Sequence, residues 1–169
     1  MSDSERTGTP ESTAPKAPAI IVGIDGSESS VKALKHASRL AAALGAPLEA
    51  VTVWQLTHTI YDISRSEPDW TPERDIEKLL SDAADAAFGE SRPAGFTMTV
   101  LQGNPARTLI RYSADAEMLV LGSRGHGGFT GLLLGSVSNA TVAHASCPVL
   151  IVHNNDEVPV AAETATTTG

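Results

Sequence analysis

The sequence predicts an α/β fold, in which a five-stranded parallel sheet has helices on both faces in a three-layer, Rossmann-like arrangement. Short apolar runs typical of buried strands alternate with longer segments whose apolar residues recur at helical spacing. The segments run strand–helix four times and end on a fifth strand. Because such crossovers place successive strands parallel, a single α/β domain is expected.

The first half of the chain begins with a run of β-branched residues, 19–25, which is typical of a strand buried on both faces. Ser27 follows as a good N-cap for a helix, and Gly45 with Pro47 end that helix. A second strand is expected at 48–54.

The connection 55–70 is long for a compact domain, and its role stays open. The later elements are expected, in order, as a helix that begins at Thr71 and Pro72, a strand at 96–101, a helix that begins at Asn104 and Pro105, a strand at 117–121, a helix at 136–145 and a strand at 148–152.

The two ends of the chain are rich in Ser, Thr, Pro, Ala and charged residues. Residues 1–18 and 155–169 are therefore expected to be disordered tails around a domain at 19–154.

The composition also narrows the partners and the compartment. A net charge of −8 argues against nonspecific binding to nucleic acid or to anionic membranes. No apolar run approaches the roughly 18 residues that span a bilayer. The single Cys147 fits a reducing compartment, and the amino-terminal residues lack a signal pattern, so a cytoplasmic protein is expected.

A glycine-rich stretch follows the fourth strand. The apolar run 118–121 ends at Gly122, and Gly135-Ser136 begin the last helix. Bare backbone N–H groups at a positive helix end form an anion site. If the first and fourth strands are neighbours where the strand order reverses, this stretch forms one site with Asp25-Gly26-Ser27.

Several motif classes are excluded. A Walker loop fails because Gly128 stands where lysine is required, and a dinucleotide turn fails because Asp25 lies where a pyrophosphate would approach. A hydrolase nucleophile elbow fails at Leu121, where glycine is required before Ser123. The histidines and the cysteine lack zinc-ligand spacing.

The remaining pattern is Gly122-x2-Gly125-x9-Gly135-Ser136. With Gly-Ile-Asp-Gly-Ser, Gly-Asn-Pro-Ala and Cys-Pro-Val-Leu-Ile-Val elsewhere in the chain, it resembles the universal stress protein family over residues 19–153. The resemblance implies the adenine nucleotide alpha hydrolase-like form of the fold. Since this glycine spacing marks the ATP-binding branch, it also implies ATP or another adenine nucleotide as ligand.

The resemblance assigns roles to individual residues. Asp25 would accept hydrogen bonds from ribose hydroxyls or hold Mg²⁺, and the alternative is a turn or cap on the following helix. Arg124 would pair with a phosphate or lie in solvent, and His126 would line the phosphate path or lie at the surface. The expected binding residues are Gly23, Ile24 and either Ala50 or Val51 around the adenine; Asp25; and Leu121, Gly122, Ser123, Arg124, Gly125, His126, Gly135, Ser136 and Val137 toward the ribose and phosphates.

The fifth strand, Pro148–Val152, is apolar throughout, and an uncovered apolar edge invites pairing with another chain. The resemblance implies a homodimer through this strand and a nucleotide-dependent role in a stress response, read by a protein partner that the sequence does not indicate. No general base stands beside the phosphate site, so at most slow ATP hydrolysis is expected. Two alternatives stay open: an ATP hydrolase or adenylyl-transferring enzyme, and a nucleotide-free, chaperone-like module.

Overall fold

The first strand of the chain, β1 (Ile20–Gly23), lies at the centre of the sheet in the computed structural model, which describes residues 18–55, 71–125 and 134–153. Five strands pair in the order β3-β2-β1-β4-β5, and every neighbouring pair is parallel. The other strands are β2 (Leu48–Trp54), β3 (Phe96–Gln102), β4 (Met118–Gly122) and β5 (Val149–Val152).

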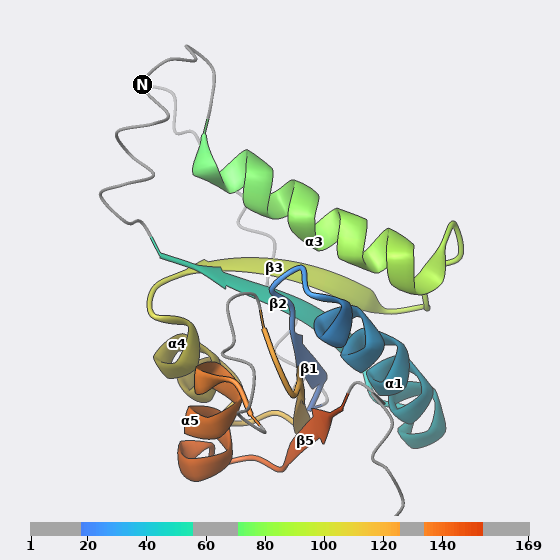
Figure 1. The fold of residues 1–169 in the computed structure, drawn as a ribbon. Helices are drawn as coiled ribbons and strands as arrows, with labels where there is room; N and C mark the ends of the chain where they lie inside the picture. Colours follow the sequence, from blue (N-terminus) through green and yellow to red (C-terminus); the bar gives the residue numbers. More distant parts are fainter. Residues whose placement is uncertain (1–17, 56–70, 126–133, 154–169) are drawn as a thin grey trace, which may run out of the picture.

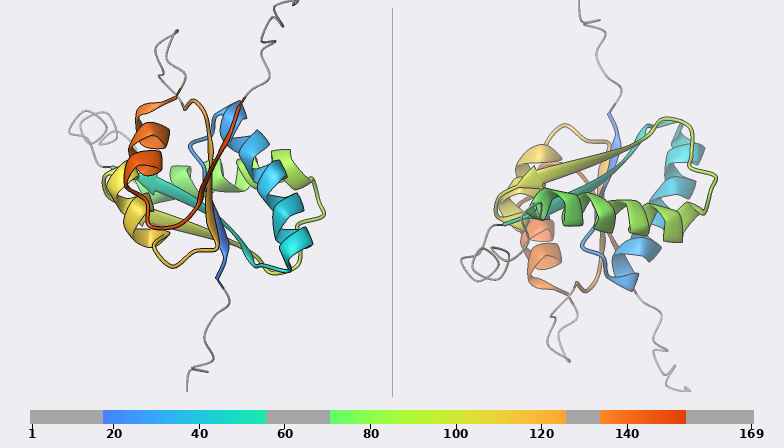
Figure 2. Two further views of the ribbon diagram at one scale, coloured as in Figure 1. Left: turned by 90° about the horizontal axis from the view of Figure 1, so that it is seen from below. Right: turned by 90° about the horizontal axis from the view of Figure 1, so that it is seen from above.

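Helices cover both faces of the sheet, as predicted (Figure 1, Figure 2). One face carries α1 (Glu28–Leu44) and α3 (Pro72–Phe88), and the other carries α4 (Pro105–Tyr112) and α5 (Ser136–His144). Each face has its own apolar cluster, because alternate side chains of a strand point to opposite faces. The predicted three-layer fold is confirmed.

The two strands at the centre show this alternation directly. Val22 and Ala50 pack in the cluster beneath α1 and α3, whereas Ile21 and Val51 pack in the cluster beneath α4 and α5. All four side chains are 4% exposed or less. The continuous apolar runs in the sequence therefore have a physical cause, since both faces of these strands are covered.

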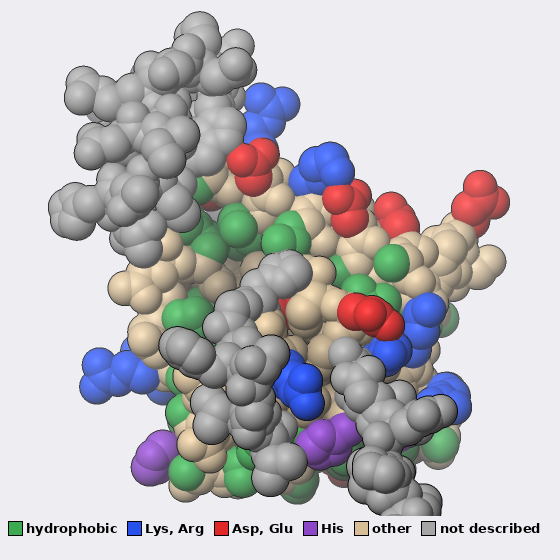
Figure 3. Space-filling view, in the orientation of Figure 1, with side chains coloured by type: hydrophobic (Ala, Val, Ile, Leu, Met, Phe, Trp, Pro, Cys, Tyr) green, Lys and Arg blue, Asp and Glu red, His purple; other side chains and the backbone are tan. Residues whose placement is uncertain are grey.

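The outer surface of α3 is polar. Charged side chains, most of them acidic, lie along it (Figure 3), and Lys78 Nζ lies 2.6 Å from Asp82 Oδ2, one helical turn away. This polar side explains why a helix with a buried Leu80 also has a high charge content.

The first strand is shorter than predicted. Ile24 N still donates to Val51 O at 2.8 Å, but the chain then turns away at Gly26, whose φ of +82° favours glycine. Ser27 caps α1 as expected, because its Oγ accepts a hydrogen bond from Ser30 N at 3.2 Å.

The order of the strands reverses at β1, which pairs with β2 on one side and with β4 on the other. The first and fourth strands are therefore neighbours, which meets the condition for a single site at their carboxyl ends. The last register pair between β1 and β2 is Gly23 with Val51, so Thr52, Val53 and Trp54 extend past β1 and pair with β3 alone. Within the described ranges, no helix has the length and apolar character needed to cross a membrane.

Candidate functional site

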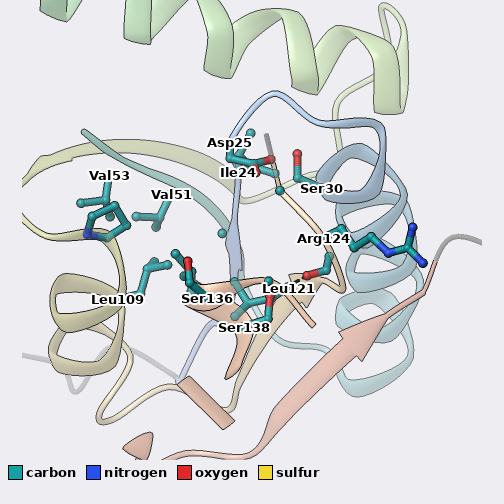
Figure 4. A pocket seen from close by; sticks show the side chains of 16 residues that line it. Ile24, Asp25, Ser30, Val51, Val53, Leu109, Leu121, Arg124, Ser136 and Ser138 are labelled. Carbon is teal, nitrogen blue, oxygen red and sulfur yellow. Dashed lines mark hydrogen bonds between the residues drawn. The ribbon is translucent and has the colours of Figure 1, made fainter. Parts of the chain in front are cut away.

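A cavity of about 290 Å³ lies at the carboxyl ends of β1 and β4, at the point where the strand order reverses (Figure 4). This is where ligands bind in open α/β sheets. Its lining comes from the strand ends, from the turn after each strand, and from the first residues of α4 and α5: Gly23, Ile24, Asp25, Ser30, Val51, Val53, Pro105, Leu109, Leu121, Gly122, Arg124, Gly125, Gly135, Ser136, Val137 and Ser138.

One end of the cavity is apolar. Val51 and Val53 of β2 lie across from Leu109 of α4 (Figure 4). Pro105, the first residue of α4, also lines the cavity. Leu121 at the end of β4 adds a further apolar wall. A slot lined by aliphatic side chains suits a flat, weakly polar ring.

The other end of the cavity is built from small residues and backbone. Gly135 N donates to Ser123 O at 2.8 Å, so the two ends of the glycine-rich stretch are joined. Ser138 Oγ donates to Gly122 O at 2.8 Å and ties α5 to the end of β4. These bonds place the amino terminus of α5, with Ser136, at the cavity, and a helix amino terminus is a favourable position for an anion.

Asp25 has both of the structural features considered from the sequence. Its Oδ1 accepts from Ser27 N at 3.0 Å and from Ser27 Oγ at 2.6 Å, which is the turn that precedes α1. The residue is also exposed and lines the cavity. Contact with a ribose or with Mg²⁺ stays a prediction.

Packing inside the protein requires glycine at the end of β4, at Gly122, whereas Gly125 lies against the movable end of the Asp25 side chain. A Cβ at Gly122 would collide with Ser29 Oγ and lie 2.8 Å from the Ser29 backbone carbon on α1, and a Cβ at Gly125 would collide with Asp25 Oδ2. Packing against α1 is therefore sufficient reason for glycine at position 122, whether or not a ligand approaches it. Gly135 differs, because the nearest atom to its Cβ position is Gly125 N at 3.6 Å.

Most of the expected binding residues line the cavity, three described residues do not support their expected contact, and one expected residue is not described. Ala50 points to the opposite face and is buried among α1 and α3 side chains, so Val51 is the cavity residue of that pair. Ser123 is 3% exposed and does not line the cavity. The side chain of Arg124 points away from the cavity (Figure 4), so Arg124 does not bring its guanidinium group to the cavity wall. His126 lies outside the described residues.

Sequence reasoning missed five lining residues: Ser30, Val53, Pro105, Leu109 and Ser138. Val53 could have been found, because it is two residues from Val51 and faces the same side of the sheet. The two α4 residues could not, since nothing in the local sequence says which face of the sheet a helix covers.

The charge within the cavity is low. Among the residues that line it, Asp25 carries the carboxylate and Arg124 the cationic group, which points elsewhere. The described part of the chain contains no group of three or more His, Cys, Asp and Glu residues that could hold a metal ion. Any anion in this cavity would therefore be held chiefly by backbone N–H groups and serine hydroxyls.

The sequence profile of the universal stress protein family matches residues 18–153. The chain belongs to this family. Curated relatives include a universal stress protein of Mycolicibacterium smegmatis, 35% identical over 79% of this chain and 45% of its own length. Universal stress protein Rv2623 of Mycobacterium tuberculosis is 32% identical over 83% of this chain and 47% of its own length. The chain thus spans about half the length of these universal stress proteins.

Solved structures of universal stress proteins share the fold. One, in complex with cAMP, is 28% identical, with a TM-score of 0.60 over 82% of this chain and 98% of its own. Another, from Archaeoglobus fulgidus in complex with dAMP, has a TM-score of 0.57 over 81% of this chain and 98% of its own, and its 20% identity supports the fold alone.

Proposed function

We propose that this universal stress protein binds an adenine nucleotide, ATP or a close relative, in the cavity at the carboxyl ends of β1 and β4, and that it acts as a nucleotide-dependent regulatory protein. The observation that carries the proposal is the cavity itself. An apolar slot at one end and a helix amino terminus at the other match a base and a phosphate joined by a ribose. The related protein in complex with cAMP supports this choice of ligand class.

The lining residues divide the ligand into three parts. The base would lie between Val51 and Val53 on one side and Leu109 on the other. The ribose would lie beside Asp25, whose carboxylate accepts hydrogen bonds from hydroxyl groups. The phosphates would meet the backbone N–H groups at the start of α5 and the Ser136 hydroxyl.

Most ligands of the proposed Mg²⁺ would come from the nucleotide phosphates and water rather than from the protein. Asp25 is the single carboxylate among the cavity-lining residues, and its Oδ1 already accepts two hydrogen bonds from Ser27. Mg²⁺ in nucleotide sites is commonly held by one or two carboxylates together with phosphate oxygens and water. The metal would therefore neutralise phosphate charge, with Asp25 as its protein contact.

Charge reversal at the helix amino terminus tests the site. Ser136→Glu places a carboxylate at the first residue of α5, where it stabilises the helix but repels phosphate. The variant should fold normally and bind ATP, AMP and cAMP at least about tenfold more weakly than the unmodified protein, by isothermal titration with and without Mg²⁺.

Asn139→Glu is the matched control, because it adds the same charge to an exposed position of the same helix that does not line the cavity. It should bind within about twofold of the unmodified protein. Equal affinity of the Ser136→Glu variant, or no binding of any adenine nucleotide by the unmodified protein, would overturn the proposed function.

A further inference from the structure

A polar cluster lies on the same side of the sheet as the cavity, at the far end of α4. Glu49 of β2 is 7% exposed, and its Oε1 accepts hydrogen bonds from Tyr112 Oη at 2.7 Å and from Thr99 Oγ1 at 2.6 Å. Tyr112 is the last residue of α4, and Thr99 belongs to β3. Nothing in the site described above uses these three residues.

The Tyr112 hydrogen bond links the last residue of α4 to β2, in addition to the apolar packing of Leu109. At the other end, Gly103 N donates to Trp54 O at 2.8 Å, immediately before α4 begins. This bond continues the pairing of β3 with β2 and fixes the point at which the chain leaves the sheet toward α4. The wall residue Leu109 lies between that point and Tyr112, one turn before Tyr112.

Holding a helix through a buried carboxylate carries a free-energy cost. Burying a carboxylate costs free energy unless hydrogen bonds compensate for the lost water, and well-packed apolar residues often stabilise as much or more. The recorded partners of the Glu49 side chain, within the described ranges, are two neutral hydroxyl groups and no cation. A hydrogen bond of fixed length and direction supplies something that apolar packing does not, which is a defined position for α4.

We propose that Glu49 and Tyr112 form a clamp that positions α4 and so sets the width of the slot between Leu109 and the β2 residues Val51 and Val53. The inference rests on the proposed function, since the slot is where the base would lie. Glu49 and Tyr112 touch no ligand in this arrangement. They are positioning residues that determine whether a flat ring is gripped on both faces.

A pair of single-hydroxyl deletions separates this role from general support of a buried charge. Tyr112→Phe and Thr99→Val each remove one hydroxyl from Glu49 Oε1, but only Tyr112 belongs to α4. Tyr112→Phe should weaken AMP and cAMP binding about five- to tenfold, the size expected for one hydrogen bond to a charged group, while Thr99→Val should stay within about twofold. Equal losses in the two variants would overturn the clamp.

Substitutions of Glu49 test whether the hydrogen-bond acceptor, rather than the charge, is what positions α4. Glu49→Gln keeps a carbonyl oxygen that accepts from Tyr112 and should retain affinity within about threefold. Glu49→Leu removes the acceptor and should bind as weakly as Tyr112→Phe, although its thermal unfolding temperature should equal or exceed that of the unmodified protein. A merely structural role predicts that affinity and unfolding temperature fall together in the Glu49→Leu variant.

Hydrogen exchange of the nucleotide-free protein tests the clamp without any ligand. Tyr112→Phe should speed amide exchange in the peptide that spans α4 at least about threefold, because the helix loses its hydrogen bond to Glu49, and Thr99→Val should not. Unchanged exchange in Tyr112→Phe would overturn the clamp whatever the affinities. Faster exchange in a protein that binds no nucleotide would instead retain the clamp and overturn the proposed function.

Discussion

At the scale of single residues, two glycines of the same motif differ in how closely other parts of the protein pack against them. Gly122 and Gly135 belong to the same motif, yet a Cβ at Gly122 would meet the Ser29 backbone on α1 and a Cβ at Gly135 would meet nothing closer than 3.6 Å. The first glycine allows α1 to approach β4 closely. The motif is therefore partly a packing motif.

This difference predicts unequal effects of one added methyl group. Gly122→Ala should lower the free energy of unfolding by about 1–3 kcal/mol, the usual cost of overpacking, and Gly135→Ala by less than about 1 kcal/mol. Urea denaturation followed by circular dichroism measures both. Similar stability of the two variants would contradict the packing role of Gly122.

The hydroxyl group of Tyr112 is expected to titrate at a higher pH than an ordinary tyrosine, and this affects stability in alkaline solution. Burial, together with its hydrogen bond to Glu49, raises the pKa of the Tyr112 hydroxyl above its ordinary value. The pKa of Tyr112 is therefore higher in the folded protein than in the unfolded chain. The contribution of the protonated Tyr112 hydroxyl to folding stability is complete at pH values below the unfolded-state pKa, and it is lost as the pH rises through the folded-state pKa.

The ultraviolet difference between the unmodified protein and Tyr112→Phe isolates the titration of this residue, since the chain has 2 tyrosines. The difference should titrate above the ordinary tyrosine pKa of about 10. A midpoint at or below that value would contradict the raised pKa of Tyr112 and its hydrogen bond to Glu49.

At the scale of elements, β5 is a short strand at the edge of the sheet, and all four of its residues are half-buried. The carbonyls of Pro148 and Val152 accept hydrogen bonds from Leu119 N and Ser123 N of β4. By alternation, the N–H and C=O of Ile151 face the open side of the sheet. The proposed homodimer would use these outward groups, since an uncovered edge pairs readily with a second copy.

Removing one outward N–H tests the dimer. Ile151→Pro should leave the bonds to β4 in place and shift the protein toward monomer by at least about tenfold in dissociation constant, because proline cannot donate to a new partner. Ile151→Val keeps the N–H and should remain dimeric. Light scattering after gel filtration reports both masses, and a proline variant as dimeric as the valine control would argue against pairing through β5.

At the scale of the whole molecule, residue spacing predicts the elements well and the site only in part. Proline and glycine at the element ends, such as Pro72, Gly45 and Pro105, locate the helices to within a few residues. The choice between Ala50 and Val51 needs the face that each helix covers, which is a property of the assembled sheet. The direction of Arg124 and the part that α4 plays in the wall are likewise set by contacts between distant segments.

Ligand binding to the folded chain should also raise its global stability. If the cavity binds an adenine nucleotide, a concentration 100 times the dissociation constant should add about 2.7 kcal/mol to the free energy of unfolding. The urea midpoint should rise with AMP and with ATP plus Mg²⁺, and it should rise much less in the Ser136→Glu variant. An equal rise in both proteins would place the binding outside the cavity.

The three residues of β2 that pass beyond β1 give the cavity its depth. If all the strands ended at one level, the sheet would have a flush rim, and the turns and helices would close directly over it. Here β2 extends beyond the end of β1, and Val53 in that extension forms part of the cavity wall. The relative lengths of neighbouring strands therefore contribute to the size of this cavity, so an insertion or deletion near Val53 should change the cavity size more directly than an exchange of side chains.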